Sequence, residues 1–161
     1  MQNNSTELDY VSYLNKWVEK VAEPSSNLGG YATCPFAKQA QKNQILIEKI
    51  NVLDIIPPKN IIFEIIIYVV EDNIDHQALY DYAQVLNFKH KELVFLADHP
   101  NDPIKTGTDT YSSNGKYNLL ICQPKDKLRI ARESLSKTQY YSFWNPEYLK
   151  KIMGEDYNLL D

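Results

Sequence analysis

The sequence has little glycine, little cysteine and no long uninterrupted apolar run. Only 5 of its 161 residues are glycine, so we expect no extended flexible linker. The longest apolar stretch, 61–70, contains Glu64 and is about half the ~20 residues that a membrane span needs. The first residues lack the basic-then-apolar pattern of a secretory signal. With two cysteines and no such signal, we expect a cytoplasmic protein with reduced thiols and no membrane partner.

Basic residues are fewer than acidic ones, 17 against 21, which gives a net charge of -4. Proteins that bind duplex nucleic acid usually carry a basic face, so we expect no double-stranded nucleic acid partner. The 43% hydrophobic content is that of a folded chain. We predict one α+β domain over 1–161, with an N-terminal helix and Cys-Pro-Phe loop (1–43), a sheet core (44–140) and an aromatic and helical extension (141–161).

The spacing of apolar residues predicts the order α-β-β-α-β-β-α-α, with a short extra helix after Cys34. The first helix should begin at Ser5 or Thr6 and end near Ala22. Later helices should begin at Asp72 or Asn73, near Asp126, and at Asn145-Pro146, the last of them ending at Gly154. The predicted strands are 44–53, 61–70, 93–97 and 117–123.

Strands 44–53 and 61–70 flank turn residues 57–60 and are predicted to form an antiparallel hairpin. A right-handed crossover should then make 61–70 and 93–97 parallel, with 117–123 antiparallel between them. This describes a circularly permuted, ferredoxin-like two-layer sandwich. Its four-stranded sheet is mostly antiparallel, two long helices lie on one face, and extra helices lie at both termini.

Strand 61–70 is apolar on both faces, whereas an open antiparallel sheet normally alternates apolar and polar residues. The second face therefore needs a cover. The N-terminal helix or the C-terminal aromatic segment is favoured over a second subunit, because an exposed patch of that size is unusual on a monomer. The aromatic cluster 140–144 is either this cover or a patch that binds a partner, so self-association into a homo-oligomer stays open.

Cys34 is the main candidate for chemistry. It precedes Pro35 at a predicted helix start, where backbone N–H groups would stabilise a thiolate. Thr33 could supply a hydrogen bond, and Gly30 would let the backbone approach a ligand closely. The alternative is a cysteine that fills a small apolar space, which is also our expectation for Cys122 in a central strand.

His99 lies in a turn with Asp98 and Asp102 after a predicted strand. His99 could act as a base toward Cys34 with Asp98 or Asp102 behind it, or the group could hold a divalent metal. A proline-rich turn with solvated side chains is the alternative. Because no ligand set at a recognised metal spacing is visible, we predict no metal and no cofactor.

Arg129 and Arg132 lie three residues apart on a predicted helix and could together bind a carboxylate or phosphate. The alternative is a solvated face on which they pair with Glu133. Lys116 is a further candidate for an anionic ligand.

The segment Cys34-Pro35-Phe36-Ala37-Lys38, with an upstream helix containing Trp17 and a downstream His99-Pro100, resembles a small bacterial family of unknown function marked by a Cys-Pro-Phe-Ala-Lys motif. The resemblance spans roughly residues 8–135 and implies interest in Cys34 and His99 without implying an activity. In that family an arginine and a proline precede the fourth strand. Here Lys116 stands in that region, and lysine lacks the bidentate geometry of arginine.

Two functions follow as hypotheses. The first is a binding or assembly module that takes a small molecule, an anionic ligand or a second copy of the chain. The second is a thiol-dependent enzyme or redox-responsive protein that uses Cys34 with His99 and Asp98.

Overall fold

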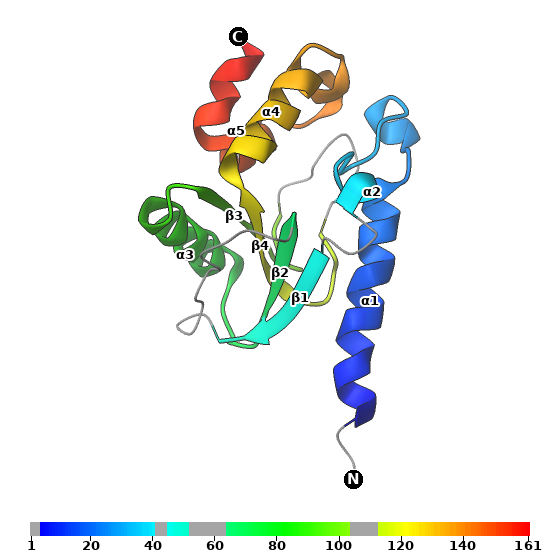
Figure 1. Ribbon diagram of the computed structural model, residues 1–161, viewed down its shortest axis with the longest axis vertical. Coiled ribbons are helices and arrows are strands. Elements are labelled where there is room, and N and C mark those ends of the chain that lie inside the picture. Colours follow the sequence, from blue (N-terminus) through cyan, green and yellow to red (C-terminus); the bar gives the residue numbers. More distant parts are fainter. Residues whose placement is uncertain (1–3, 41–44, 52–63, 104–112) are drawn as a thin grey trace.

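A four-stranded sheet forms the centre of the molecule. The computed structural model describes residues 4–40, 45–51, 64–103 and 113–161. Helix α3 (His76–Lys89) lies on one face of the sheet and α1 (Asn4–Ala22) on the other, while α4 (Lys125–Ser136) and α5 (Pro146–Met153) lie beyond one end of the strands (Figure 1). The α+β class with a four-stranded sheet is therefore confirmed. Among the described helices, none is both long and apolar enough to cross a membrane.

The sheet has the order β1-β2-β4-β3 and is mixed. Its strands are β1 (Ile45–Ile50), β2 (Ile65–Val70), β3 (Leu93–Asp98) and β4 (Asn118–Pro124). Strand β4 is antiparallel to both neighbours, but β1 is parallel to β2. The predicted hairpin is therefore wrong, because parallel strands need a crossover of about a dozen residues or more and not a tight turn. The predicted turn 57–60 lies outside the described residues, and the permuted ferredoxin-like arrangement is not confirmed.

Capping side chains set where two of the helices begin. The Asp75 carboxylate accepts from Ala78 N at 2.7 Å, so α3 starts at the next residue, a few positions later than predicted. Asn145 accepts from Glu147 N at 2.9 Å, and α5 ends at Gly154, whose φ is 53°. The predicted start and end of α5 are confirmed.

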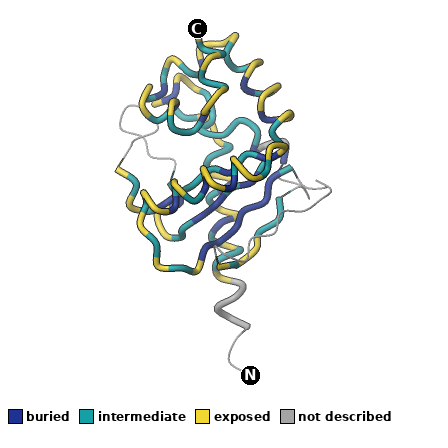
Figure 2. Tube along the Cα trace, turned by 90° about the vertical axis from the view of Figure 1, so that its left-hand side faces the viewer, coloured by how far each residue is buried: buried dark blue, intermediate teal, exposed yellow. Residues whose placement is uncertain are grey.

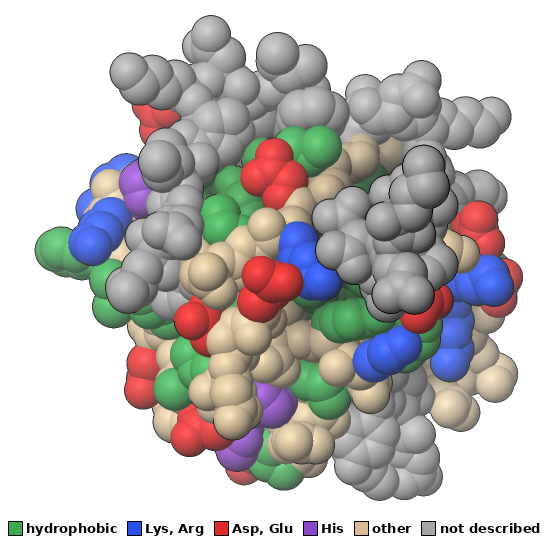
Figure 3. Space-filling view, turned by 90° about the horizontal axis from the view of Figure 1, so that it is seen from below, with side chains coloured by type: hydrophobic (Ala, Val, Ile, Leu, Met, Phe, Trp, Pro, Cys, Tyr) green, Lys and Arg blue, Asp and Glu red, His purple; other side chains and the backbone are tan. Residues whose placement is uncertain are grey.

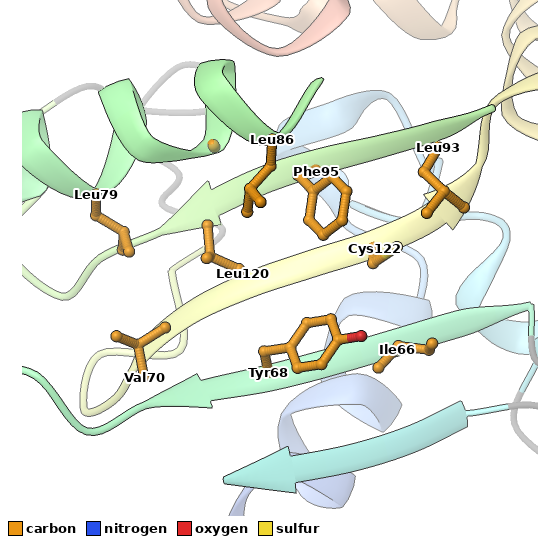
Figure 4. Packing of buried hydrophobic residues seen from close by; sticks show 10 residues of the cluster. Ile66, Tyr68, Val70, Leu79, Leu86, Leu93, Phe95, Leu120 and Cys122 are labelled. Carbon is orange, nitrogen blue, oxygen red and sulfur yellow. The ribbon is translucent and has the colours of Figure 1, made fainter. Parts of the chain in front are cut away.

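The first face of the sheet packs against α3 as a continuous apolar core. The even-numbered residues of β2 share it with residues of β4, β3 and α3 (Figure 4): Ile66, Tyr68, Val70, Leu120, Cys122, Phe95, Leu79 and Leu86. Buried positions run along the central strands (Figure 2). Cys122 is part of this core, as predicted.

The second face carries the odd-numbered residues of β2, Ile65, Ile67 and Val69, which pack under Leu14 and Val18 of α1. The prediction that the N-terminal helix covers this face is confirmed. The prediction that two long helices share the opposite face is wrong, since α4 packs with η3 (Tyr140–Phe143) and η4 (Gly154–Leu160). Strand β4 runs into α4 without an intervening loop, so the helix continues past the strand end and does not fold back over the sheet.

The loop after α1 packs against the C-terminal part of the chain. Leu28, in η1 (Ser26–Leu28), belongs to the same apolar cluster as Tyr140, Trp144, Leu149 and Met153. Gly29 has a φ of 63°, and a Cβ there would lie 2.3 Å from the Phe143 ring. Only glycine allows this contact, which brings the N-terminal loop onto the C-terminal unit of α4, η3, α5 and η4.

Candidate functional site

A cavity of about 160 Å³ lies where the second face of the sheet meets α1, the Cys34 segment and the C-terminal unit. We call it the interlayer cavity. Its sheet wall is mostly aliphatic, with Ile65, Ile67, Leu96 and Ile121, and also includes Asp98 and Gln123. An apolar cavity of ~150 Å³ is large enough for benzene, whereas sites for drug-sized ligands are roughly 300–1,000 Å³. The cavity therefore suits a molecule of about one ring.

Aromatic side chains of the C-terminal unit form the part of the wall that lies beyond the end of the sheet. Tyr140 and Trp144 have ring centroids 5.3 Å apart, and Trp144 stacks on Tyr148 at 5.6 Å. Tyr141 lies 4.9 Å from Tyr140 and also lines the cavity. The cluster at 140–144 packs with α5 and the N-terminal loop, and it contributes to the cavity wall from the end of the sheet. The sequence showed this density of aromatic residues but not the space beside them.

Cys34 lines the cavity and is half-buried. Its N–H donates to Val21 O at 2.8 Å, which fastens the segment to the end of α1. Burial raises the pKa of the Cys34 thiol, and the nearby N–H groups of Ala37 and Phe36 offset only part of this effect. The expected thiolate-stabilising helix is short, because α2 spans only Ala37–Ala40. The surroundings of Cys34 therefore favour the thiol over the thiolate.

Thr33 and Gly30, two other predicted ligand-binding residues, have structural roles. The Tyr140 hydroxyl donates to Thr33 O at 2.7 Å, and Thr33 lines the cavity. Gly30 has a φ of 87° and nothing lies within 4 Å of a Cβ built there, so it permits the loop conformation. The close approach expected at Gly30 occurs instead at Gly29, against Phe143.

His99 is buried, and both of its ring nitrogens bond to backbone. Nε2 donates to Ile74 O at 2.8 Å, and Nδ1 accepts from Asn101 N at 3.0 Å. These bonds fix the neutral Nε2–H tautomer. Among the described residues that line the cavity with Cys34, His99 is not present. The structure thus uses His99 to hold the start of α3 against the end of β3, and it does not bring His99 to Cys34.

Asp98 lines the interlayer cavity but bonds to Asn114, which donates from its backbone N at 3.0 Å and from Nδ2 at 2.6 Å. Burial raises the pKa of Asp98 to about 6, against the effect of these hydrogen bonds. Asp102 pairs with Lys151 at 3.0 Å. Within the described parts of the chain, no group of three His, Cys, Asp or Glu side chains is placed to hold a metal ion.

The two arginines have different environments. Arg132 is buried, donating from Nη1 to Asp156 at 3.1 Å and from Nη2 to Ile152 O at 3.0 Å, and it lines the cavity. Arg129 is exposed, so the expected two-arginine grip does not form. Lys116 lies over the rings of Tyr13 and Tyr117 and does not line the cavity.

Trp144 carries a buried hydrogen-bond donor that our sequence analysis missed. Its side chain lines the cavity and the residue is 8% exposed, yet among the described residues Nε1 has no acceptor. Leaving such a group unpaired costs about 1–3 kcal/mol. No pattern in the sequence separates this tryptophan from an ordinary core residue.

Acidic and basic side chains are interspersed on the face seen in Figure 3. Comparison of the chain with protein-family models, with curated proteins and with solved structures finds no match. The site must therefore be interpreted from its own geometry.

Proposed function

We propose that this protein is a non-catalytic binding module that holds a small, mainly apolar molecule in the interlayer cavity. The observation that supports this most directly is the cavity itself, a space of about 160 Å³ between the sheet, α1, the Cys34 segment and the C-terminal unit, which is lined mostly by aliphatic and aromatic side chains. Mostly apolar pockets with a few polar groups are typical of small-molecule sites.

The size of the space limits the affinity. The best small ligands gain at most about 1.5 kcal/mol per non-hydrogen atom, and most gain much less. We expect a single-ring compound to bind with a Kd on the order of 0.1–1 mM, equivalent to about 4–5.5 kcal/mol. A larger natural ligand would extend beyond the cavity.

Two observations favour ligand binding over assembly. Helix α1 covers the apolar second face of the sheet, and the aromatic residues at 140–144 pack within the C-terminal unit. Both features that motivated self-association are thus used inside one chain. A homodimer remains a prediction that sedimentation at high concentration tests, and the cytoplasmic location also remains a prediction.

Tryptophan fluorescence tests the proposal, because both tryptophans of the chain, Trp17 and Trp144, line the cavity. Titration with toluene should change the emission with saturation. The substitution Ile121→Phe puts a larger side chain into the space and should weaken binding at least tenfold. Ile130→Phe, at a residue that is 66% exposed, is the matched control and should bind as the wild type does. Equal binding by all three proteins, or none by the wild type, would contradict the proposal.

A thiol-dependent activity is the second candidate, supported by the position of Cys34 in the cavity wall. It needs a thiolate, and burial opposes one by raising the pKa of Cys34. We expect alkylation of native Cys34 by iodoacetamide to be slow at pH 7 and to become slower when toluene occupies the cavity. Fast alkylation near pH 7, unaffected by toluene, would favour the thiol function instead.

A further inference from the structure

Asp98 places a carboxylate in the wall of the interlayer cavity. Leu96 lies two residues before Asp98 on β3 and pairs with Ile121 on the cavity face of the sheet. Because the side chains of a strand alternate, the Asp98 side chain lies on this same face. Both hydrogen bonds from Asn114 reach Oδ2, and the nearby Ser113 hydroxyl donates to backbone. The other oxygen, Oδ1, accepts no hydrogen bond from the described residues and is not fully buried, so it is open to a ligand.

The charges around the cavity differ in whether they are paired. Arg132 lies 3.1 Å from Asp156, and because the two side chains are only 5% and 12% exposed, their charges compensate each other. Lys151 pairs with Asp102 at 3.0 Å. Among the described residues Asp98 has no cationic partner, and after burial the neighbouring charge that raises its pKa is that of Asp102. A half-buried carboxylate without a partner is unfavourable, so the cavity wall lacks one positive charge.

Helix α1 brings an aromatic ring to the Asp98 end of the cavity. The Tyr13 hydroxyl donates to Asn114 O, and Asn114 in turn donates to Asp98. Trp17 lies one turn further along α1, on the same side of the helix as Tyr13, and lines the cavity. Indole is the aromatic group that binds cations best, within about 6 Å of the ring centroid. Trp17 therefore suits a positively charged ligand that Asp98 holds.

Helix α5 brings a second ring to the same end. Lys151 of α5 pairs with Asp102, which lies in the loop that follows Asp98. Tyr148 lies one turn before Lys151 and lines the cavity, with its ring stacked on Trp144. The ring face of tyrosine also attracts cations. An ammonium group at this end of the cavity would thus have one carboxylate and aromatic rings from two helices around it.

From these contacts we infer that the ligand is a small organic cation, a protonated amine on a single ring or short branched apolar chain, which donates to Asp98 Oδ1. Its apolar part lies against Ile67 and Ile121, and Trp17 and Tyr148 flank its charged end. This inference rests on the proposed function and narrows it. The anionic ligand that the sequence suggested is replaced by a cationic one.

Three compounds of nearly equal shape separate the possibilities: benzylamine, benzyl alcohol and benzoate. At pH 7 benzylamine is a cation and benzoate an anion, while Asp98, with a pKa of about 6, is largely ionised. Calorimetric titration of the wild-type protein should give the tightest binding for benzylamine, about tenfold tighter than benzyl alcohol, which is the value of one hydrogen bond between charged groups. Benzoate should bind more weakly than both. Ile121→Phe should weaken benzylamine at least tenfold, as it weakens toluene, because both occupy the cavity.

The substitution Asp98→Asn keeps the shape of the side chain and removes its charge. It should abolish the preference, so that benzylamine and benzyl alcohol bind within about twofold of each other. The matched control is Asp81→Asn, at an exposed residue of α3, which changes the net charge of the chain by the same amount. This variant should keep the wild-type preference for benzylamine.

Equal binding of benzylamine and benzyl alcohol by the wild type, tightest binding of benzoate, or an undiminished preference in Asp98→Asn would overturn the inference. If toluene binds in any of these cases, the proposed function stands. Failure of toluene and of all three compounds to bind would overturn both. The wild-type series and Ile121→Phe decide the matter even if Asp98→Asn does not fold.

Discussion

The two faces of strand β2 have the same kind of residues and different surroundings. On the α3 side, Ile66 and Tyr68 lie in a continuous apolar core that Phe95 and Leu120 complete (Figure 4). On the α1 side, neighbouring Ile65 and Ile67 border a cavity. One regular helix packs along the first face, whereas three irregularly joined parts of the chain share the second. On the first face α3 alone packs against the strands. On the second, α1, the Cys34 segment and the C-terminal unit meet, and the cavity lies where they meet.

The contact between Gly29 and Phe143, which holds the N-terminal loop on the C-terminal unit, gives the largest predicted change in stability. Gly29→Ala places a Cβ 2.3 Å from Phe143 at a φ of 63° and should destabilise the fold by about 3 kcal/mol, from backbone strain plus overpacking. Gly30→Ala has comparable backbone strain but open space around it, so it should cost only about 1 kcal/mol. Urea unfolding measures both. Equal losses would mean that the Phe143 contact does not hold the loop.

Asp98 allows the cavity side to be tested by pH, since it is a half-buried carboxyl that lines the cavity. Its pKa is raised from 3.8 to about 6, so the folded state binds more protons than the unfolded state between these values. The stability that protonated Asp98 contributes is present below pH 4 and lost as pH rises through 6. Between pH 4 and pH 7 the wild type should lose about 2 kcal/mol more than Asp98→Asn. Parallel curves of unfolding free energy against pH for the two proteins would contradict the raised pKa of Asp98.

On the α3 side, the Asn87 side chain binds the backbone of the edge strand. Replacing it should destabilise the fold less than the changes above. The Asn87 side chain donates to Phe95 O at 3.1 Å and accepts from Phe95 N at 2.6 Å, so it occupies the outward backbone groups of edge strand β3. Asn87→Leu should cost about 1 kcal/mol and promote self-association through the exposed edge. The exposed Gln84→Leu on the same helix is the control. Light scattering that shows equal association of both variants would contradict this role.

Local signals in the sequence were enough for some of these features. Asn145-Pro146 carries its own cap and first-turn proline, so the start of α5 could be predicted. The two apolar faces of β2 required a cover, and α1 provides it. The direction of β1 could not be read in this way, because the apolar pattern of a strand is the same whether it pairs parallel or antiparallel, and β1 is parallel to β2.

The site depended still more on long-range packing. Arg129 and Arg132 are equivalent in the sequence, and only the position of α5 and η4 buries one of them. His99 looked suited to act as a base beside Cys34, but its ring is used by two backbone groups that spacing does not reveal. The unpaired Trp144 N–H depends on which acceptors the folded chain brings near it, which no single segment encodes.

Adjacent residues of β4 offer the most direct test, because Leu120 faces the α3 core and Ile121 faces the cavity. Each is replaced with phenylalanine, and the free energy of unfolding is measured in urea. The two losses show how much space each face of the sheet has for a larger side chain. Leu120→Phe should lose about 1–3 kcal/mol by overpacking, and Ile121→Phe should stay within about 1 kcal/mol of the wild type. Equal losses of unfolding free energy at the two positions would show that Ile121 does not border an empty space.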